Sequence, residues 1–564
     1  GDMPDLRLGC TSGAEPRGAG IGPQWPMHRR RGAVELESAT RGDTDWRQDP
    51  DSEAVRSWAR GRGARVSLRL RADGSGERVF VDPQGRERVF HGTNVVVKGA
   101  PWLPRLDHFD PLTSLVQRDF DFLLDAGINL IRLGVMWPGA EPARGEYNET
   151  YFSSVREIVK TAGSRGVYVL LDMHQDLLSE HFCGEGIPSW AVEPLKRHWE
   201  RFPVPLWARP VEPGADGFPT RQDCAEIFSE NPFSHGWATG QGTIAAGHAY
   251  DSLFLNVNNM TEAWGAFWAK TASAVKGLDN VLGFELMNEP FAGDPFTHPL
   301  LLEPGRADRE RLQPAYDAVV RHIRAVDDAT LVFFAGVTWD NVHPAGFTAA
   351  PGGAQDRANR SVLSYHYYVP PQGRDFEAYL RTRRQDATRL GTGLMMTESC
   401  CEQLHDLAVP ALGAAGHSWI HWEWKDWCRE DLDDASRASS SQGAAWGACK
   451  TGFGAGPWSE VPYLPAVAGT LGGTAWNAST GVFTATFRPD PSLAGGTEAL
   501  VSPVSFPAGY DVAVEPAVLA VERRPEAARV LLTPLANASA SQVVTVTITR
   551  RSPGAAKAAE VLVV

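Results

Sequence analysis

Eight short apolar runs recur along most of this chain of 564 residues, and segments with a helical period of apolar residues lie between them. Residues 113–126 and 261–276 are two such helical segments. Strands and helices that alternate in this number predict an α/β fold, a closed parallel (β/α)8 or TIM barrel. The predicted strands are residues 90–97, 128–135, 167–174, 281–287, 330–336, 362–368, 393–399 and 417–425.

The chain outside the barrel divides into two parts of different character. Residues 1–65 are rich in Arg, Gly, Asp and Ser and poor in aliphatic residues, which predicts disorder. We assign residues 66–455 to the barrel domain, which begins with a hairpin at 80–90. Residues 456–564 contain short Val- and Thr-rich runs separated by Pro, Gly and Asn, which predicts an antiparallel β-sandwich.

Composition limits the partners of this chain. The net charge of −14 argues against nucleic acid or an anionic membrane surface as a partner. No apolar run is long enough for a transmembrane helix, and no signal peptide is visible. Five Asn-X-Ser/Thr sequons indicate a secreted protein or one of an endomembrane or lysosome-like compartment, and we expect a monomer.

Seven cysteines leave two readings open. Proximity in the sequence suggests the disulfides Cys183–Cys224 and Cys428–Cys449, while free thiols are the alternative. The first pair would lie in the long interval between the third and fourth strands. That interval contains a segment at about 180–250, rich in Pro, Trp, Gly and Cys, which we expect to shape the cleft.

Polar and aromatic residues stand at the ends of the predicted strands, and strand ends form the catalytic end of such a barrel. These residues are Arg132, His174, Asp176, Asn288, Glu289, His366, Tyr368, Glu398, Trp422 and Trp424. Ordinary structural roles remain open for several of them, above all for the histidines and tryptophans. A metal site made of His174, Asp176 and His366 has no supporting ligand spacing, so we expect neither a metal nor a cofactor.

Two of the carboxylates suggest glycoside hydrolysis. Retaining glycosidases place two carboxyl groups about 5–5.5 Å apart. We expect Glu289 to be the general acid/base, and Glu398 to be the nucleophile, kept ionised by Arg132 and hydrogen-bonded by Tyr368. Asn288 is expected to bond the sugar 2-OH. Trp422 or Trp424 would stack under the sugar. The two are separated by one residue in a predicted strand, and alternate residues of a strand face the same side, so we expect both to point the same way.

These strand-end residues resemble those of glycoside hydrolase family 5, and within it the endoglycoceramidase group. Residues 91–98, 172–176, 184–190, 256–268 and 462–470 carry the closer resemblance. It implies a retaining enzyme that cleaves the β-linkage between glycan and ceramide in glycosphingolipids, with Lys98 reaching the sugar. It also implies a cleft that is polar toward the sugar and apolar toward the lipid, with contact to a membrane or micelle.

Three other functions remain open at this point. An exo-acting β-glucosidase on glucosylceramide or sterylglucoside would share the fold and the catalytic residues. An endo-β-glucanase of the same family is a second alternative. A non-catalytic glycolipid-binding protein is a third, although both expected catalytic glutamates are present.

Overall fold

The computed structural model describes residues 64–552. Within this range it leaves out residues 111–112, 193–201, 208–209, 216, 230–236, 354–358, 370, 401–402, 426–460 and 526–527. Residues 1–63 of the segment predicted to be disordered lie outside the described residues, as does the predicted Cys428–Cys449 pair.

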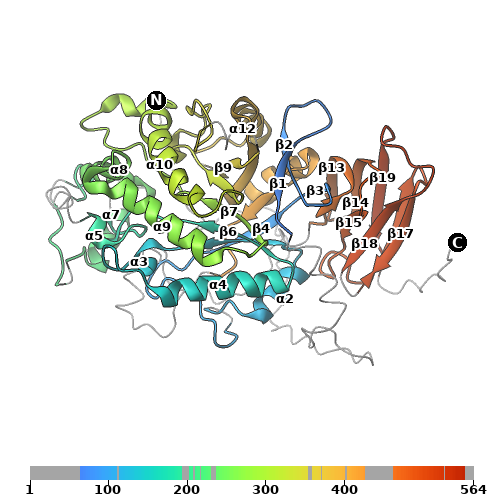
Figure 1. The fold of residues 1–564 in the computed structure, drawn as a ribbon, viewed down its shortest axis with the longest axis horizontal. Helices are drawn as coiled ribbons and strands as arrows, with labels where there is room; N and C mark the ends of the chain where they lie inside the picture. The colour runs from blue at the N-terminus through green and yellow to red at the C-terminus, as the bar shows by residue number, and fades with distance from the viewer. Residues whose placement is uncertain are drawn as a thin grey trace, which may run out of the picture.

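A closed barrel of eight parallel strands forms the centre of the fold (Figure 1). All eight predicted strands are confirmed, although the last is shorter than predicted. The first four are buried along their whole length, which explains their continuous apolar runs. The strands are β4 (His91–Val95), β5 (Leu130–Gly134), β6 (Tyr168–Asp172), β7 (Val281–Glu285), β8 (Leu331–Phe334), β9 (Ser361–Tyr367), β10 (Gly393–Ser399) and β11 (Trp419–His421).

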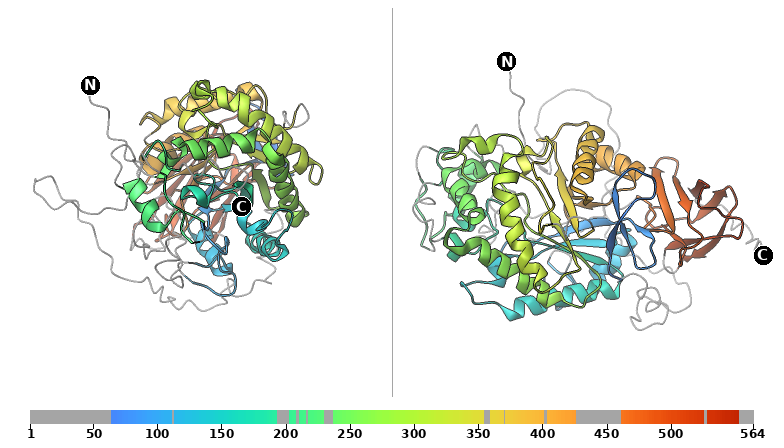
Figure 2. Two further views of the ribbon diagram at one scale, coloured as in Figure 1. Left: turned by 90° about the vertical axis from the view of Figure 1, so that its left-hand side faces the viewer. Right: turned by 45° about the horizontal axis from the view of Figure 1, so that its top comes forward.

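Helices surround this barrel (Figure 2). In α4, Tyr151, Val155 and Ile158 are buried at helical spacing, and the side chain of Asn148 caps the first turn by accepting from the Tyr151 N–H. The predicted helices at 113–126 and 261–276 are confirmed as α2 and α9. The outer helices are α2 (Gln117–Asp125), α4 (Glu149–Ser164), α9 (Met260–Val275), α10 (Gln313–Arg324), α12 (Phe376–Leu390) and α13 (Val409–Ala415).

Two antiparallel sheets follow the barrel in the sequence, as predicted. β14 and β19 alternate buried and less buried residues, and they pack Phe483, Phe487, Val546 and Ile548 into a second core. The smaller sheet contains β13 (Gly469–Asn477), β14 (Val482–Pro489), β19 (Val544–Arg550) and β16 (Tyr510–Glu515). The larger sheet contains β12 (Ala466–Val467), β15 (Thr497–Leu500), β18 (Arg529–Pro534) and β17 (Leu519–Arg524).

The larger sheet also includes three strands from the start of the barrel domain, β1 (Ser67–Leu70), β2 (Arg78–Val81) and β3 (Glu87–Arg88). β2 and β3 form the hairpin predicted at 80–90. These strands continue the larger sheet, because Arg88 of β3 pairs with Ala466 of β12. The predicted boundary between the barrel domain and the sandwich, at residues 455 and 456, therefore divides strands of one sheet. β3 lies before this boundary and pairs with β12, which lies after it.

The same hairpin closes the amino-terminal end of the barrel. Phe80 stacks on Phe333 with ring centroids 6.3 Å apart and meets the edge of Phe90 at 5.5 Å. Tyr463, which precedes β12, stacks on His91 at the start of β4 with a centroid distance of 3.6 Å. The sandwich thus packs at the end of the barrel opposite to the strand ends that carry the predicted site (Figure 1).

The long interval between β6 and β7 adds short helices at the catalytic end. They are η2 (Glu180–Phe182), α5 (Ser189–Val192), α7 (Arg221–Ser229), η4 (Trp237–Gly242), α8 (Ile244–Phe254) and η5 (Val257–Asn259). The predicted disulfide Cys183–Cys224 is confirmed and links two parts of this insertion. Within the described residues, no helix combines the length and apolarity needed to cross a membrane.

Candidate active site

Arg132 lies at the centre of the site, on β5, with no exposed surface. Its guanidinium pairs with Glu285 (Nε to Oε2, 2.6 Å), Asp172 (Nη2 to Oδ1, 3.0 Å) and Glu398 (Nη1 to Oε2, 3.2 Å). Burial acts to lower the pKa of Arg132, but these carboxylates raise it above its ordinary value. A permanent cation therefore ties the ends of β6, β7 and β10 together.

Glu398, the expected nucleophile, lies near the end of β10 and is 7% exposed. The hydroxyl of Tyr368 donates to its Oε1 at 2.7 Å, while Arg132 donates to its Oε2. Burial raises the pKa of Glu398, whereas His366 and Arg132 act to lower it. Arg132 thus favours the carboxylate as expected, but burial has the larger effect in the free enzyme.

Glu289, the expected acid/base, follows β7 in a turn whose backbone is unusual. Its φ of +38° lies in the left-handed region that non-glycine residues rarely adopt. A carboxylate oxygen of Glu289 lies within 4.8 Å of one of Glu398. Carboxyl groups this close are typical of retaining glycosidases, since inverting enzymes separate theirs by about 6.5–9.5 Å.

His366 of β9 lies beside both carboxylates. Its Nδ1 is 2.8 Å from Oε1 of Glu289 and 3.9 Å from Oε1 of Glu398. Burial acts to lower the pKa of His366, but Glu398 and Glu289 raise it above its ordinary value. The imidazole is therefore placed to hold the Glu289 carboxyl in one orientation.

Asn288 is fixed on both sides of its amide and is 2% exposed. Its Oδ1 accepts from Nη2 of Arg132 at 2.9 Å, and its Nδ2 donates to the carbonyl of Gln175 at 3.0 Å. Nε2 of His174 lies 3.5 Å from the same Nδ2. The amide is thus held in one orientation by neighbouring residues, and its predicted bond to a sugar hydroxyl stays a prediction.

A second polar group lies around Lys98, in the loop after β4. Its Nζ pairs with Asp176 and lies 3.4 Å from Oε1 of Glu185. His174 bridges to this group, with Nε2 3.6 Å from Asp176 and Nδ1 2.9 Å from Asp172. Burial acts to lower the pKa of His174, but hydrogen bonds to Asp172 and Asp176 raise it to about 9.

The structure separates the two tryptophans after β11. Trp422 is half-buried, stacks on His174 with ring centroids 5.4 Å apart, and has Nζ of Lys98 4.9 Å from its ring centroid. Trp424 is 4% exposed and belongs to the hydrophobic core of the barrel. β11 ends at His421, so the strand alternation expected to align the two does not extend to them. The predicted sugar contact of Trp424 stays a prediction.

Among the described residues, buried groups close enough to hold a cation occur within this site. They are His174, Asp176 and Glu185, and Glu289, His366 and Glu398. The ammonium of Lys98 pairs with Asp176 and Glu185 of the first group, and the guanidinium of Arg132 pairs with Glu398 of the second. The chemistry described below is derived from these side chains.

Four polar residues of the site are assigned no role from sequence: Asn94, Asp172, Gln175 and Glu185. Asn94 accepts from Nη1 of Arg132 at 2.9 Å, and Asp172 joins Arg132 to His174. Gln175 contacts the backbone of the acid/base turn. All four lie in the segments 91–98, 172–176 and 184–190, which carry the closer family resemblance. Their position in these segments is the sequence feature that could have indicated a role in the site. Glu285 also belongs to this network, since it binds Arg132.

Family models match both parts of the chain. A model described as cellulase (glycosyl hydrolase family 5) matches residues 107–426. A model of the glycoside hydrolase family 5 C-terminal domain matches residues 462–548. The first match covers the barrel from β5 to β11, and the second covers the strands that follow the barrel.

Individual proteins resemble this chain over most of its length. An endoglycoceramidase of Hydra vulgaris is 39% identical over 451 residues, which cover 78% of this chain and 82% of that protein. An endoglycoceramidase of Cyanea nozakii is 43% identical over 357 residues, covering 62% and 68%. The structure of endo-glycoceramidase II from Rhodococcus sp. has the same fold, with a TM-score of 0.59, 22% identity, and coverage of 84% of this chain and 99% of that chain.

Proposed function

This chain belongs to glycoside hydrolase family 5, and we propose that it is a retaining β-glycosidase that hydrolyses the bond between glycan and ceramide in glycosphingolipids. The observation that carries the proposal is the pair Glu289 and Glu398, within 4.8 Å of each other. It occurs in a chain whose relatives at 43% and 39% identity are endoglycoceramidases.

The first step forms a glycosyl–enzyme ester. A carboxylate oxygen of Glu398 attacks the anomeric carbon while Glu289 donates its proton to the departing ceramide oxygen. Tyr368 and Arg132 each hold one oxygen of Glu398, so the carboxylate is oriented before attack. The bond between the anomeric carbon and the ceramide oxygen breaks, and ceramide leaves as a neutral alcohol.

The second step releases the glycan. Glu289, now a carboxylate, takes a proton from water, and the water oxygen attacks the anomeric carbon from the face that ceramide left. The ester bond breaks, and Glu398 regains its negative charge beside Arg132. Two inversions give net retention, and the proton on Glu289 restores the starting state.

The test of this function is incubation with a ganglioside, glucosylceramide, a sterylglucoside and a soluble β-glucan, followed by product analysis. Release of an intact oligosaccharide and free ceramide from the ganglioside is the expected result. Activity confined to glucosylceramide or the sterylglucoside would contradict the endo-acting proposal. Binding of the lipids without turnover would support a non-catalytic protein.

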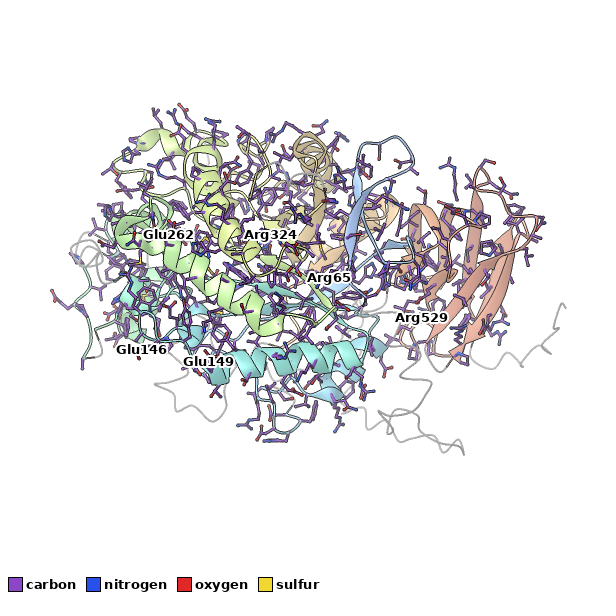
Figure 3. All side chains as sticks on the ribbon, in the orientation of Figure 1. Arg65, Glu146, Glu149, Glu262, Arg324 and Arg529 are labelled. Carbon is purple, nitrogen blue, oxygen red and sulfur yellow. A yellow bond between two sulfur atoms is a disulfide. The ribbon has the colours of Figure 1, made fainter. Side chains whose placement is uncertain are left out.

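We also propose that the catalytic end of the barrel contacts the lipid surface that holds the substrate. Glu149 and Glu262, in the first turns of α4 and α9, lie at that end (Figure 3). Large apolar side chains are exposed around it, either just before α9 or in the loops after β7 and β8. This apolar rim consists of Leu255, Val257, Phe296, Leu300, Leu302 and Val342. Because the net charge is −14, attachment by apolar side chains is favoured over attraction to anionic lipid.

The apolar rim predicts a selective defect. Changing Phe296, Leu300 and Leu302 to Ser should reduce binding to phosphatidylcholine vesicles and turnover of glycolipid embedded in them, while leaving a soluble aryl glycoside unaffected. Val521 and Leu535 are exposed on the sandwich and provide matched control substitutions to Ser. Equal vesicle binding by the rim variant and the wild-type protein would contradict the proposal.

We propose a secreted protein or one of an endomembrane or lysosome-like compartment, because the Cys183–Cys224 disulfide is of a kind that persists in oxidising surroundings. Loss of mass on removal of N-linked glycans from the natural protein would support this route, and a thiol-reduced Cys183 would argue against it. We further propose a monomer, and light scattering that gives twice the chain mass would contradict it.

A further inference from the structure

Gln175 contacts the acid/base turn through its side-chain amide and has no exposed surface. It lies three residues beyond β6, and its Nε2 donates to the carbonyl oxygen of Asn288 at 2.7 Å and to that of Glu289 at 2.8 Å. These two bonds use both N–H groups of the amide. They hold the backbone at the residue whose φ is +38°, a conformation that persists only where its surroundings enforce it.

The other side of this amide is equally occupied. Its Oε1 accepts from the backbone N–H of Leu178 at 2.8 Å and from the hydroxyl of Tyr250 at 2.7 Å. Two carbonyls face the nitrogen and two donors face the oxygen, so the amide has one satisfactory orientation. Tyr250 belongs to α8 and is fully buried, so the contact joins the acid/base turn to the insertion between β6 and β7.

The stem and the backbone of Gln175 are also closely packed. A Cβ atom on Gly186 would approach the Cβ of Gln175 to 2.2 Å, so the loop after η2 packs directly against it. Asn288 returns a hydrogen bond to the Gln175 carbonyl at 3.0 Å. Gln175 and the turn that carries Glu289 therefore form one rigid unit.

We propose that Gln175 is a positioning residue for the general acid/base. By holding the carbonyls of Asn288 and Glu289 it fixes the turn, and so places the Glu289 carboxyl at the leaving-group oxygen. Tyr250 supports it from α8. This inference rests on the proposed retaining mechanism, and it assigns to the insertion a part in catalysis through the backbone of the turn.

A positioning role and a packing role predict different results for Gln175→Glu. The substitution keeps the shape but removes N–H donors from the two carbonyls, so the turn loses its support. If the acid/base is displaced, kcat/KM should fall most for substrates whose leaving group needs protonation. If Gln175 only packs, every substrate should lose activity in proportion to the loss of folded enzyme.

The experiment uses aryl glycosides of the glycan that the wild-type enzyme releases from glycosphingolipid. For Gln175→Glu we expect kcat/KM to fall about 100-fold with a phenyl leaving group, which is within the range of general acid catalysis, and much less with 2,4-dinitrophenyl. Added azide should accelerate turnover of the dinitrophenyl glycoside and yield the β-glycosyl azide. Azide attacks the anomeric carbon without a base and displaces the Glu398 carboxylate.

Three variants accompany this measurement. Tyr250→Phe removes one bond to Gln175 and should give the same pattern at about 2- to 10-fold. Glu289→Gln is the positive control for azide rescue. Gln313→Glu is the matched control, because Gln313 is a buried glutamine that bonds the backbone of Thr348 and Ala349 on the outside of the barrel. It should leave the ratio between the two glycosides unchanged.

Equal losses on both aryl glycosides, without an azide effect, would overturn the positioning role. Failure of the wild-type enzyme to release any glycan is a different result and would overturn the proposed function itself. Thermal unfolding of each variant separates loss of folded protein from loss of the acid/base.

Discussion

Arg132 and Glu398 are joined by a hydrogen bond of 3.2 Å, from Nη1 to Oε2, across the catalytic end from β5 to β10. Both residues are buried, and the same guanidinium also binds Glu285 and Asp172. The nucleophile therefore belongs to an ion-pair network that includes more negative than positive groups.

This contact predicts a pH effect for Arg132→Lys. Burial raises the pKa of Glu398, and Arg132 opposes that rise, so a weaker contact should raise the pKa further. Because the nucleophile acts as a carboxylate, the acidic limb of kcat/KM should move to higher pH. The measurement is the pH profile of both enzymes. A limb that stays in place or moves to lower pH would contradict the assignment.

Substitution of Glu398 and substitution of Glu289 should reduce turnover to different extents. Glu398→Gln should reduce turnover of glycosphingolipid to background, because no ester can form. Glu289→Gln should lower kcat by about 100- to 10,000-fold with poor leaving groups, which is the usual contribution of a general acid. Full turnover by Glu398→Gln would falsify the covalent mechanism.

The hydroxyl of Tyr368 donates to Oε1 of Glu398 at 2.7 Å, so removing this hydroxyl should reduce the rate of catalysis. We expect Tyr368→Phe to lower kcat/KM by about 10- to 100-fold, the cost of a hydrogen bond to a charged group. Tyr367→Phe is the control, since that hydroxyl donates to the carbonyl of Gly373. Similar losses in both variants would contradict a specific role for Tyr368.

Trp422→Ala should affect substrate binding, whereas Trp424→Ala should affect the stability of the fold. Trp422 stacks on His174 and lies beside Lys98, so its loss should raise KM with little change in stability. Trp424 is a core residue, and its loss should reduce the free energy of unfolding by about 3–5 kcal/mol. Kinetics and denaturant unfolding of both variants decide the matter. A higher KM with unchanged stability for Trp424→Ala would restore its predicted sugar contact.

His174 should make stability depend on pH. Its pKa is raised to about 9 in the folded protein, against an ordinary value of 6.5. Its contribution is therefore complete below pH 6.5 and is lost as the pH rises through 9. The free-energy difference between wild type and His174→Gln should shrink over that window by at most about 3 kcal/mol. A difference that is constant with pH would contradict the protonated imidazole.

Local sequence patterns were sufficient for the barrel and for most of the site. Strands such as β5 and β6 are buried on both faces, so their apolar runs are continuous and visible. Arg132, Glu289 and Glu398 could be located because strand ends share one face of the barrel. These predictions rest on short segments and on one topological rule.

The features that escaped prediction depend on contacts between distant segments. The period-two rule was extended to Trp422 and Trp424, but β11 ends at His421, and a strand rule has no meaning beyond its strand. Gln175 lies in a run that was recognised, yet its role depends on the turn at Glu289 and on the position of α8. Neither is visible in the five residues around it.

The sheet shared by the hairpin and the sandwich has a consequence for synthesis of the chain. Glu87 of β3 accepts a hydrogen bond from the backbone of Leu471, 384 residues away. During translation this hairpin is made before the barrel, and its partner strand β12 is made after the barrel. A strand that follows the barrel thus completes a sheet that begins before it. A chain that terminates before β12 would present an open strand edge to its neighbours, so premature termination is expected to yield aggregates.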